Sequence, residues 1–289
     1  IIHKNKFNKM KKILLTIVAL SCAALVSCGK SGAENGQETK SEMQTKVEEF
    51  ASFKLTTDMS KLTDKEKELV GIFLDIAEIM DNLFWLQSYG NKADMDTIAD
   101  QYAKEFAMIN YGPWERLNAM KPFVAGFGEK PLGAGFYAKD MTEEEFNALQ
   151  NEDKNSLYTV LRRDEQGKLI VKWYREEYAE QIGKVCGLLD KAIALAEDAG
   201  LKKYLQERKK AFETDDYFAS DMAWMDMKQS RLDFVVGPIE NYEDRLFGRK
   251  AAYEAFVLVK DEEESAKLAK FTAMLPELQK GLPCDEKFK

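Results

Sequence analysis

Histidine is almost absent from this sequence of 289 residues. The single histidine, His3, precedes the first methionine, Met10, and none follows. Without histidine, the residues after Met10 cannot build a histidine-based zinc helix, a Ser-His-Asp triad or a Cys-His pair. The sequence also lacks a Walker loop and a dinucleotide-binding glycine motif. These absences exclude the enzyme classes whose chemistry depends on those motifs.

Cysteine is scarce and forms no motif. Cys22 and Cys28 lie in an apolar region near the beginning of the sequence, and only Cys186 and Cys284 lie beyond it. No C-x-x-C pair occurs. Cys186 belongs to an apolar helical pattern, which predicts a buried thiol. Whether Cys186 and Cys284 form a disulfide is left open by the sequence, because spacing alone does not determine a pairing.

Basic residues are fewer than acidic residues in this sequence. From Cys28 onward, 262 residues carry 37 basic and 50 acidic side chains, which gives a net charge of −13. An acidic surface argues against binding to nucleic acid or, electrostatically, to anionic lipid. We therefore expect no nucleic-acid partner.

The first 27 residues resemble a secretory signal. Met10 is followed by two lysines and by an apolar run, Ile13 to Val26, that is too short to span a bilayer comfortably. Residues 1–9 are interpreted as upstream read-through. Residues 10–27 are interpreted as the signal peptide of a lipoprotein, and an ordinary cleaved signal peptide is the alternative.

The end of the apolar run predicts lipidation. Leu25-Val26-Ser27-Cys28 resembles a bacterial lipobox, in which acyl chains on Cys28 would anchor the protein to a membrane surface. The expected location is the bacterial cell envelope, facing the periplasm or the cell surface. Residues 28–59 begin with a polar segment and are expected to be a tether. The folded part is then 60–289, long enough for a sizeable core.

Helical patterns dominate these folded residues. Thr63 and Glu66 form a predicted capping box, and Thr142 with Glu145 forms another. Apolar periodicity predicts helices over 63–87, 93–110, 175–198, 201–212 and 262–280, with short ones after Thr142 and Ser220. A β-hairpin is predicted over 157–174, and a long ordered loop over 111–140. The expected fold class is α+β, mostly helical, with a small β-sheet or barrel element.

The stretch Arg231–Lys260 combines two apolar runs with a dense polar segment. Phe234-Val235-Val236 predicts a buried strand that Gly237-Pro238 ends in a turn. Ionisable groups between two core segments are costly to bury unless they are paired or functional. One interpretation is therefore a salt-bridged turn between core strands, and the other is a functional site.

This stretch resembles a known family. The pattern G-P-I-E-x-Y-E-D-x-L-F-G-x-K-A-A-x-E is similar to a block of the dipeptidyl peptidase III family, zinc exopeptidases with an HExxGH motif. Further blocks resemble its bacterial branch, in the same order along the chain. They lie at 111–117, 121–124, 140–146, 162–167, 215–217, 223–228 and 275–283.

The resemblance implies the first lobe of a two-lobed peptidase, a lobe that contains a β-barrel. It also implies zinc held by the HExxGH histidines and a later glutamate, motifs that this sequence does not contain. We therefore expect this chain to bind no zinc, to have no catalytic residue and to be inactive alone. It is expected to be the N-terminal part of an enzyme that removes dipeptides from the free amino end of peptides, contributing peptide binding.

The resemblance also implies binding residues. Asp233 matches an acidic residue that holds the amino end of the peptide, whereas Val235 stands where relatives have tyrosine. Glu240, Tyr242 and Asp244 are further candidates, and a structural network with Arg245 and Arg249 is their alternative role. Weaker candidates are Trp114, Glu115 and Arg116.

Two other functions stay open beside the peptidase part. One is a peptide-binding lipoprotein without catalysis, and the other is a helical envelope lipoprotein with only an interaction role. The Arg231–Lys260 stretch favours the peptidase part and the peptide-binding lipoprotein over the interaction role, because a plain scaffold does not require it. For peptide binding, an ammonium group needs a desolvated carboxylate opposite it.

Overall fold

The computed structural model describes residues 40–289. The predicted signal peptide at 10–27, the lipidation site Cys28 and residues 1–9 lie outside the described residues. Within the part that is described, no helix is long and apolar enough to cross a membrane.

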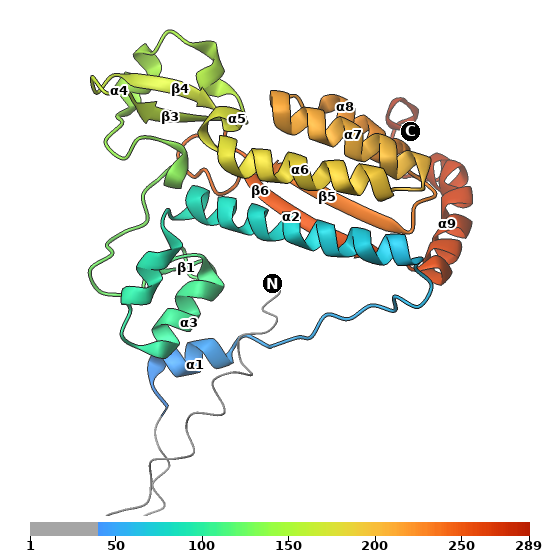
Figure 1. Cartoon of the computed structure of the whole chain (residues 1–289), viewed down its shortest axis with the longest axis horizontal. Coiled ribbons are helices and arrows are strands. Elements are labelled where there is room, and N and C mark those ends of the chain that lie inside the picture. Colours follow the sequence, from blue (N-terminus) through green and yellow to red (C-terminus); the bar gives the residue numbers. More distant parts are fainter. Residues whose placement is uncertain (1–39) are drawn as a thin grey trace, which may run out of the picture. The chain divides into compact units, whose positions relative to one another are not determined.

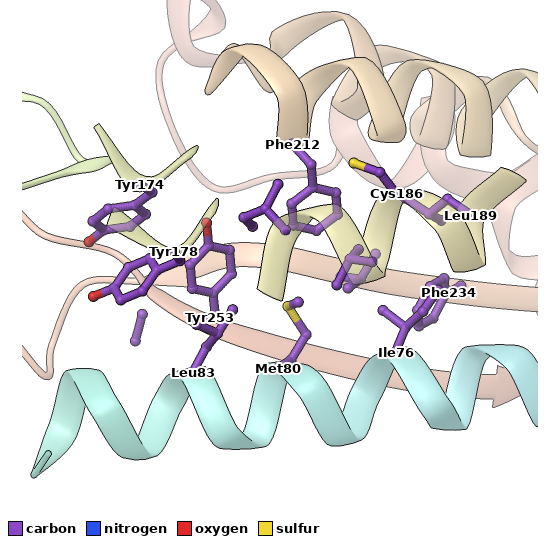
Figure 2. Close-up of a cluster of buried hydrophobic side chains, with 14 of the residues drawn as sticks. Ile76, Met80, Leu83, Tyr174, Tyr178, Cys186, Leu189, Phe212, Phe234 and Tyr253 are labelled. Atoms are coloured by element: carbon purple, nitrogen blue, oxygen red, sulfur yellow. The ribbon is translucent and has the colours of Figure 1, made fainter. Parts of the chain in front are cut away.

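Helix α2, Asp64–Ser88, lies against the main core (Figure 1). It begins at the predicted capping box, in which Thr63 and Glu66 bond each other's backbone N–H groups. One face of α2 packs against strands β5 (Leu232–Glu240) and β6 (Ala252–Val259) and against helix α6 (Ala179–Leu195). Figure 2 shows how Ile76, Met80 and Leu83 point into this core. Phe73 adds a stacked ring contact to Phe234, with ring centroids 4.2 Å apart.

Three further helices complete the core layer beside the strands. They are α6 (Ala179–Leu195), α7 (Ala199–Thr214) and α8 (Phe218–Asp226). The predicted helix over 175–198 is divided, because Tyr178 leaves helical geometry between α5 (Tyr174–Glu177) and α6. Tyr178 is itself buried and packs against the ring of Tyr253, so its side chain serves the core at this break.

The predicted helix over 93–110 is also divided. A 3-10 helix, η2 (Lys92–Thr97), precedes α3 (Gln101–Asn110). The Asp100 carboxylate accepts hydrogen bonds from the N–H groups of Tyr102 and Ala103, which fixes the beginning of α3 at that point.

Part of the expected tether is ordered. Residues Glu42–Glu48 form α1, which packs against α3. Lys46 forms an ion pair with Glu115, and the Phe50 ring contacts Phe106. The polar composition of the segment did not reveal these long-range contacts, so the tether assignment is corrected for residues 42–48.

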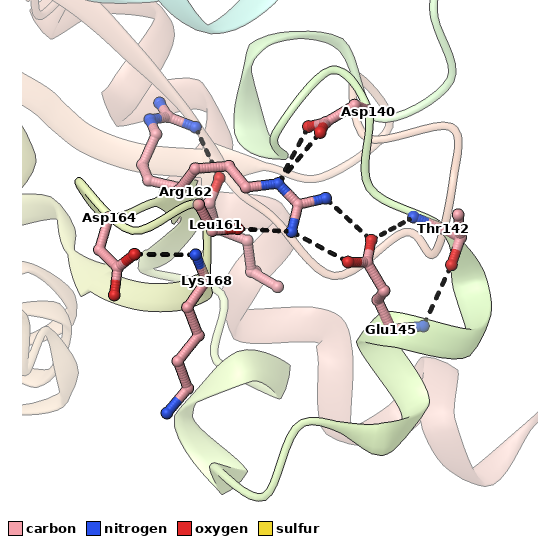
Figure 3. A network of polar contacts seen from close by, with 9 residues as sticks. Asp140, Thr142, Glu145, Leu161, Arg162, Asp164 and Lys168 are labelled. Atoms are coloured by element: carbon pink, nitrogen blue, oxygen red, sulfur yellow. Dashed lines mark hydrogen bonds and ion pairs between the residues drawn. The ribbon is translucent and has the colours of Figure 1, made fainter.

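The segment 111–140, predicted as a long loop, contains only short elements, and the predicted short helix after Thr142 and a 3-10 helix follow it. The elements are β1 (Trp114–Glu115), β2 (Lys121–Pro122) and η3 (Ala134–Phe136), followed by α4 (Glu143–Ala148) and η4 (Glu152–Asn155). The predicted hairpin forms between β3 (Thr159–Arg163) and β4 (Leu169–Trp173). Arg163 joins this hairpin to α4 by contacting both Asp140 and Glu145. Figure 3 labels these two acidic residues and marks the polar contacts that their carboxylates make. The Arg163 guanidinium lowers the pKa of Glu145.

Strands β5 (Leu232–Glu240) and β6 (Ala252–Val259) form a long antiparallel hairpin. The prediction that Gly237-Pro238 ends the first strand is wrong, because β5 continues to Glu240. A register shift between Pro238 and Glu240 accommodates the proline, which has no N–H to donate. Gly237 adopts a φ of 139°, a region that favours glycine. The strands of residues 40–289 pair only into three two-stranded sheets, so the expected element is a small sheet and no closed barrel forms.

The described chain ends with α9 (Glu262–Lys280) and a 3-10 helix, η5 (Glu286–Phe288). Helix α9 has the predicted bounds and continues through Pro276. Cys186 is buried and Cys284 is exposed, and both are free thiols. Burial raises the pKa of the Cys186 thiol to about 11, as expected for an inert core cysteine.

Candidate functional site

The hairpin β5–β6 has one buried face and one open face. Leu232, Phe234 and Val236 are buried, so Asp233 and Val235 point to the opposite side of the strand. The register places Leu258 beside Asp233, Phe256 beside Val235 and Glu254 beside Gly237. Phe256 and Leu258 are each 49% exposed. The open face therefore offers apolar surface with an acidic residue near each end.

Asp233 lies at one end of this face, beside α8. Its carboxylate accepts a hydrogen bond from the indole N–H of Trp224, at 2.8 Å. Two hollows meet at Asp233, one of about 600 Å³ and one of about 230 Å³. Lys228 lines both hollows, so a positive charge of the protein itself lies at this end.

Glu240, Tyr242 and Glu254 lie at the other end of the face. The Tyr242 hydroxyl donates to Glu254 at 3.4 Å. Burial, together with the negative charge of Glu240, raises the pKa of Glu254. Burial and the same two carboxylates raise the pKa of Tyr242, which is 63% exposed. Among the described residues, neither carboxylate forms an ion pair with lysine or arginine. The pair therefore favours the approach of a cation.

The structure does not bring the predicted site residues together. Asp233 and Glu240 are seven positions apart on one strand, roughly 23 Å at 3.3 Å per residue. A single ammonium group cannot contact both carboxylates. Glu240 and Tyr242 share one end of the face, and Asp233 lies at the other.

Asp244 lies inside the turn that joins the two strands. It is 2% exposed and accepts a hydrogen bond from the Tyr137 hydroxyl at 2.7 Å. Four backbone N–H groups, of residues 246, 247, 249 and 250, also donate to its carboxylate. Desolvation and the bond to Asp244 raise the pKa of Tyr137 far above its ordinary value. This arrangement supports the structural alternative for Asp244, because both of its oxygens already have donors.

Glu243 forms a buried ion cluster beside it. Arg116 donates to Glu243 at 2.7 Å, and Lys130 also contacts this carboxylate. Although burial opposes ionisation, these two cations lower the pKa of Glu243. Burial lowers the pKa of Lys130, which Glu243 partly offsets. Arg116 and Lys130 belong to one loop, and their ion pairs with Glu243 hold this loop against the turn that presents Tyr242.

The weaker candidates have structural partners. Trp114 is buried and donates its indole N–H to the carbonyl of Gly128 at 2.8 Å. Glu115 pairs with Lys46, which lowers the pKa of Glu115. The sequence analysis named neither Glu254 nor Lys130 as a site residue. The available signals for Glu254 were its place as the last residue of the family-like pattern and its being the single carboxylate in the otherwise apolar segment 251–259.

Comparisons with known proteins find one family model and several similar proteins. The family model described as peptidase family M49 matches residues 135–289. The structure of DPP III from Caldithrix abyssi matches with a TM-score of 0.77 and 39% identity, over 83% of this chain and 48% of that chain. Dipeptidyl-peptidase III from Corallococcus sp. strain EGB matches with a TM-score of 0.75 and 35% identity, over 84% and 48%.

A curated relative is more distant. Nudix hydrolase 3 of Arabidopsis thaliana is 27% identical over 322 residues, which cover 88% of this chain and 41% of that protein. The chain thus spans less than half the length of each of these relatives. Since the family model matches more than half of the chain, the chain belongs to peptidase family M49.

Proposed function

We propose that this chain supplies the peptide-binding part of a dipeptidyl peptidase, and that Glu240 and Glu254 bind the free amino end of the peptide. The carboxylate pair without a counter-ion among the described residues carries this proposal. An ammonium group between the two carboxylates would relieve their repulsion and would lower the pKa of Glu254. The Tyr242 hydroxyl, next to Glu254, would orient the bound group.

The open face suits the rest of an extended peptide. Beyond Glu254, the outward side chains of β6 are Phe256 and Leu258, which offer apolar contacts. The hollow beside Asp233 and Trp224 continues the face toward α8 and would accept side chains farther along the peptide. Contacts of this kind position a peptide without reacting with it.

Hydrolysis is not assigned to residues of this chain. The family uses zinc, but among residues 40–289 no group of three histidine, cysteine or acidic side chains could hold a metal ion. The described residues therefore do not fit the zinc site, and the roles proposed for them are binding and orientation.

Calorimetric titration with a pentapeptide, free or acetylated at its amino end, tests the proposal. We expect the free form to bind about tenfold to a hundredfold more tightly, the range of a charge-assisted hydrogen bond. Glu254→Gln should remove this preference, whereas Asp233→Asn should retain it. Equal affinity of the two peptides for the wild-type chain would refute an ammonium site. Loss of the preference in Asp233→Asn alone would place that site at Asp233, as the family resemblance implies.

We also propose that the chain is anchored to the cell envelope through Cys28. The lipobox-like sequence Leu25–Cys28 supports this proposal. Labelling of growing cells with a radioactive fatty acid should mark the wild-type protein and not a Cys28→Ser variant. Equal labelling of both would contradict lipidation at Cys28.

A further inference from the structure

Residues 51–58, here called the strap, connect α1 to α2 without forming a helix or a strand (Figure 1). Every residue of the strap is exposed, and the side chains of Phe53 and Leu55 reach 86% and 89% exposure. Among residues 40–289, no backbone hydrogen bond includes a residue of the strap. Its backbone groups are therefore open to another molecule.

The loop 111–140 is longer than the strap, but contacts hold it in place. Strands β1 and β2 pair within this loop, and Trp114 donates to the carbonyl of Gly128 at 2.8 Å. Arg116 joins the loop to Glu243. A protease needs an unpaired, accessible stretch of substrate, so a segment with such contacts must open before it can be cut. The strap can be cut without opening.

Lys54 is the single basic residue of the strap. Within the part of the chain that the structure describes, Lys54 forms no ion pair, whereas Lys46 in α1 pairs with Glu115. A protease whose primary pocket is acidic could therefore bind the Lys54 ammonium without breaking a contact inside this chain.

The folded body beyond the strap has its own beginning. Leu62 is buried, and the capping box of Thr63 and Glu66 begins α2. Arg231 donates to the carbonyl of Lys61 at 2.9 Å and pairs with Glu66. On the other side of the strap, α1 has no buried residue. A cut in the strap would thus leave the body complete and would leave α1 held by surface contacts only.

We infer that the strap is a proteolytic processing site, cut between Lys54 and Leu55 by a protease that accepts a basic residue. Hydrolysis of this peptide bond consumes one water molecule and leaves a carboxylate on Lys54 and an amino group on Leu55. The cut separates residues 55–289 from α1 and from everything before it. With the chain anchored through Cys28, as proposed above, the cut would also release the body from the membrane surface. The cut itself depends on neither the anchor nor the ammonium site.

Limited digestion of the full chain with trypsin, followed by mass spectrometry, tests the accessibility of this bond. Of the cuts within residues 41–289, the cut after Lys54 should come first, about tenfold or more faster than any cut in the loop 111–140. Lys54→Gln should abolish this cut. The matched control, Lys121→Gln in the loop, should leave its rate unchanged. The product 55–289 should unfold at the same temperature as the full chain, because neither α1 nor the strap has a buried residue.

Mass spectrometry of the protein recovered from growing cells tests whether the bond is processed. We expect a species that begins at Leu55 in the wild type and none in the Lys54→Gln variant. The new amino end is itself the measured quantity, so the result does not require lipidation. If the Cys28 anchor is wrong, this species is still expected, and only its release from the membrane fails.

Three results would overturn the inference. One is a first tryptic cut elsewhere within residues 41–289, and another is an unchanged rate of cutting in the strap of the Lys54→Gln variant. The third is cellular protein that is intact across the strap or is cut there at another bond.

Discussion

Two groups of acidic residues lie next to each other on the hairpin, and they have opposite surroundings. Glu243 and Asp244, in the turn, are buried and fully partnered by cations, backbone N–H groups and a tyrosine. Glu240 and Glu254, at the end of the strands, are close enough to repel each other and form no ion pair among the described residues. Only a few positions along the chain separate these two environments.

These two groups of carboxylates show that burial and charge alone do not identify a binding site. A carboxylate whose oxygens already have donors contributes to stability, because removing it leaves those donors without acceptors. A carboxylate that lacks a counter-ion gains free energy when a cation arrives. The function should therefore lie with Glu240 and Glu254, and the rigidity of the turn with Glu243 and Asp244.

The largest expected effect is at Asp244. Asp244→Ala removes the acceptor of four backbone N–H groups and of the Tyr137 hydroxyl. We expect the free energy of unfolding to fall by about 4 kcal/mol, measured by urea denaturation. Asp244→Asn, which keeps one acceptor oxygen, should lose less. A loss below about 1 kcal/mol for the alanine variant would contradict the structural role of Asp244 and its contrast with Glu240 and Glu254.

A slightly smaller effect is expected at the ion cluster. Glu243→Gln leaves the charges of Arg116 and Lys130 without a carboxylate, and should cost about 3 kcal/mol in the same measurement. Adding Lys130→Met should recover part of that loss, because it removes one of the two cations that the Glu243 variant leaves without a carboxylate. If the double variant is less stable than Glu243→Gln alone, this explanation of the cluster is wrong.

Asp215 is an intermediate case that sharpens the comparison. It is 4% exposed and accepts from the backbone N–H and the guanidinium of Arg175, but one of its oxygens has no partner. Burial outweighs these bonds and raises the pKa of Asp215 from 3.8 to about 6. The folded state then binds the proton more tightly than the unfolded state. The contribution of Asp215 to stability is therefore greatest below pH 3.8 and is lost as the pH rises to 6.

This contribution should be about 2 kcal/mol between pH 4 and pH 6.5. Chemical denaturation at several pH values should show stability falling with pH in this window, after subtraction of the profile of Asp215→Asn. A difference profile that rises over the same window would contradict the assigned direction of the pKa shift.

Local features were predictable from the sequence. The capping boxes at Thr63 and Thr142, the hairpin over 157–174 and the bounds of α9 follow from contacts between residues close in sequence. The continuation of β5 through Pro238 was not predictable in this way, because pairing with β6 overrides the local turn signal.

The candidate site was predictable only in part. Glu240, Tyr242 and Glu254 all belong to the family-like block, but the contact between Glu254 and Tyr242 depends on the register in which the two strands pair. Lys130 reaches Glu243 across 113 positions. The sequence left two roles open for Asp244, and its count of donors favours the structural one. Contacts between distant residues decide each of these cases.

The most direct test of the account is the pKa of Glu254, measured by carbon-detected NMR titration with and without a peptide. Without peptide, the pKa should lie above the ordinary value of 4.5. A peptide with a free amino end should lower it, and the same peptide acetylated at that end should not. An ordinary pKa without peptide, or equal effects of the two peptides, would contradict the claim that Glu240 and Glu254 form an ammonium site.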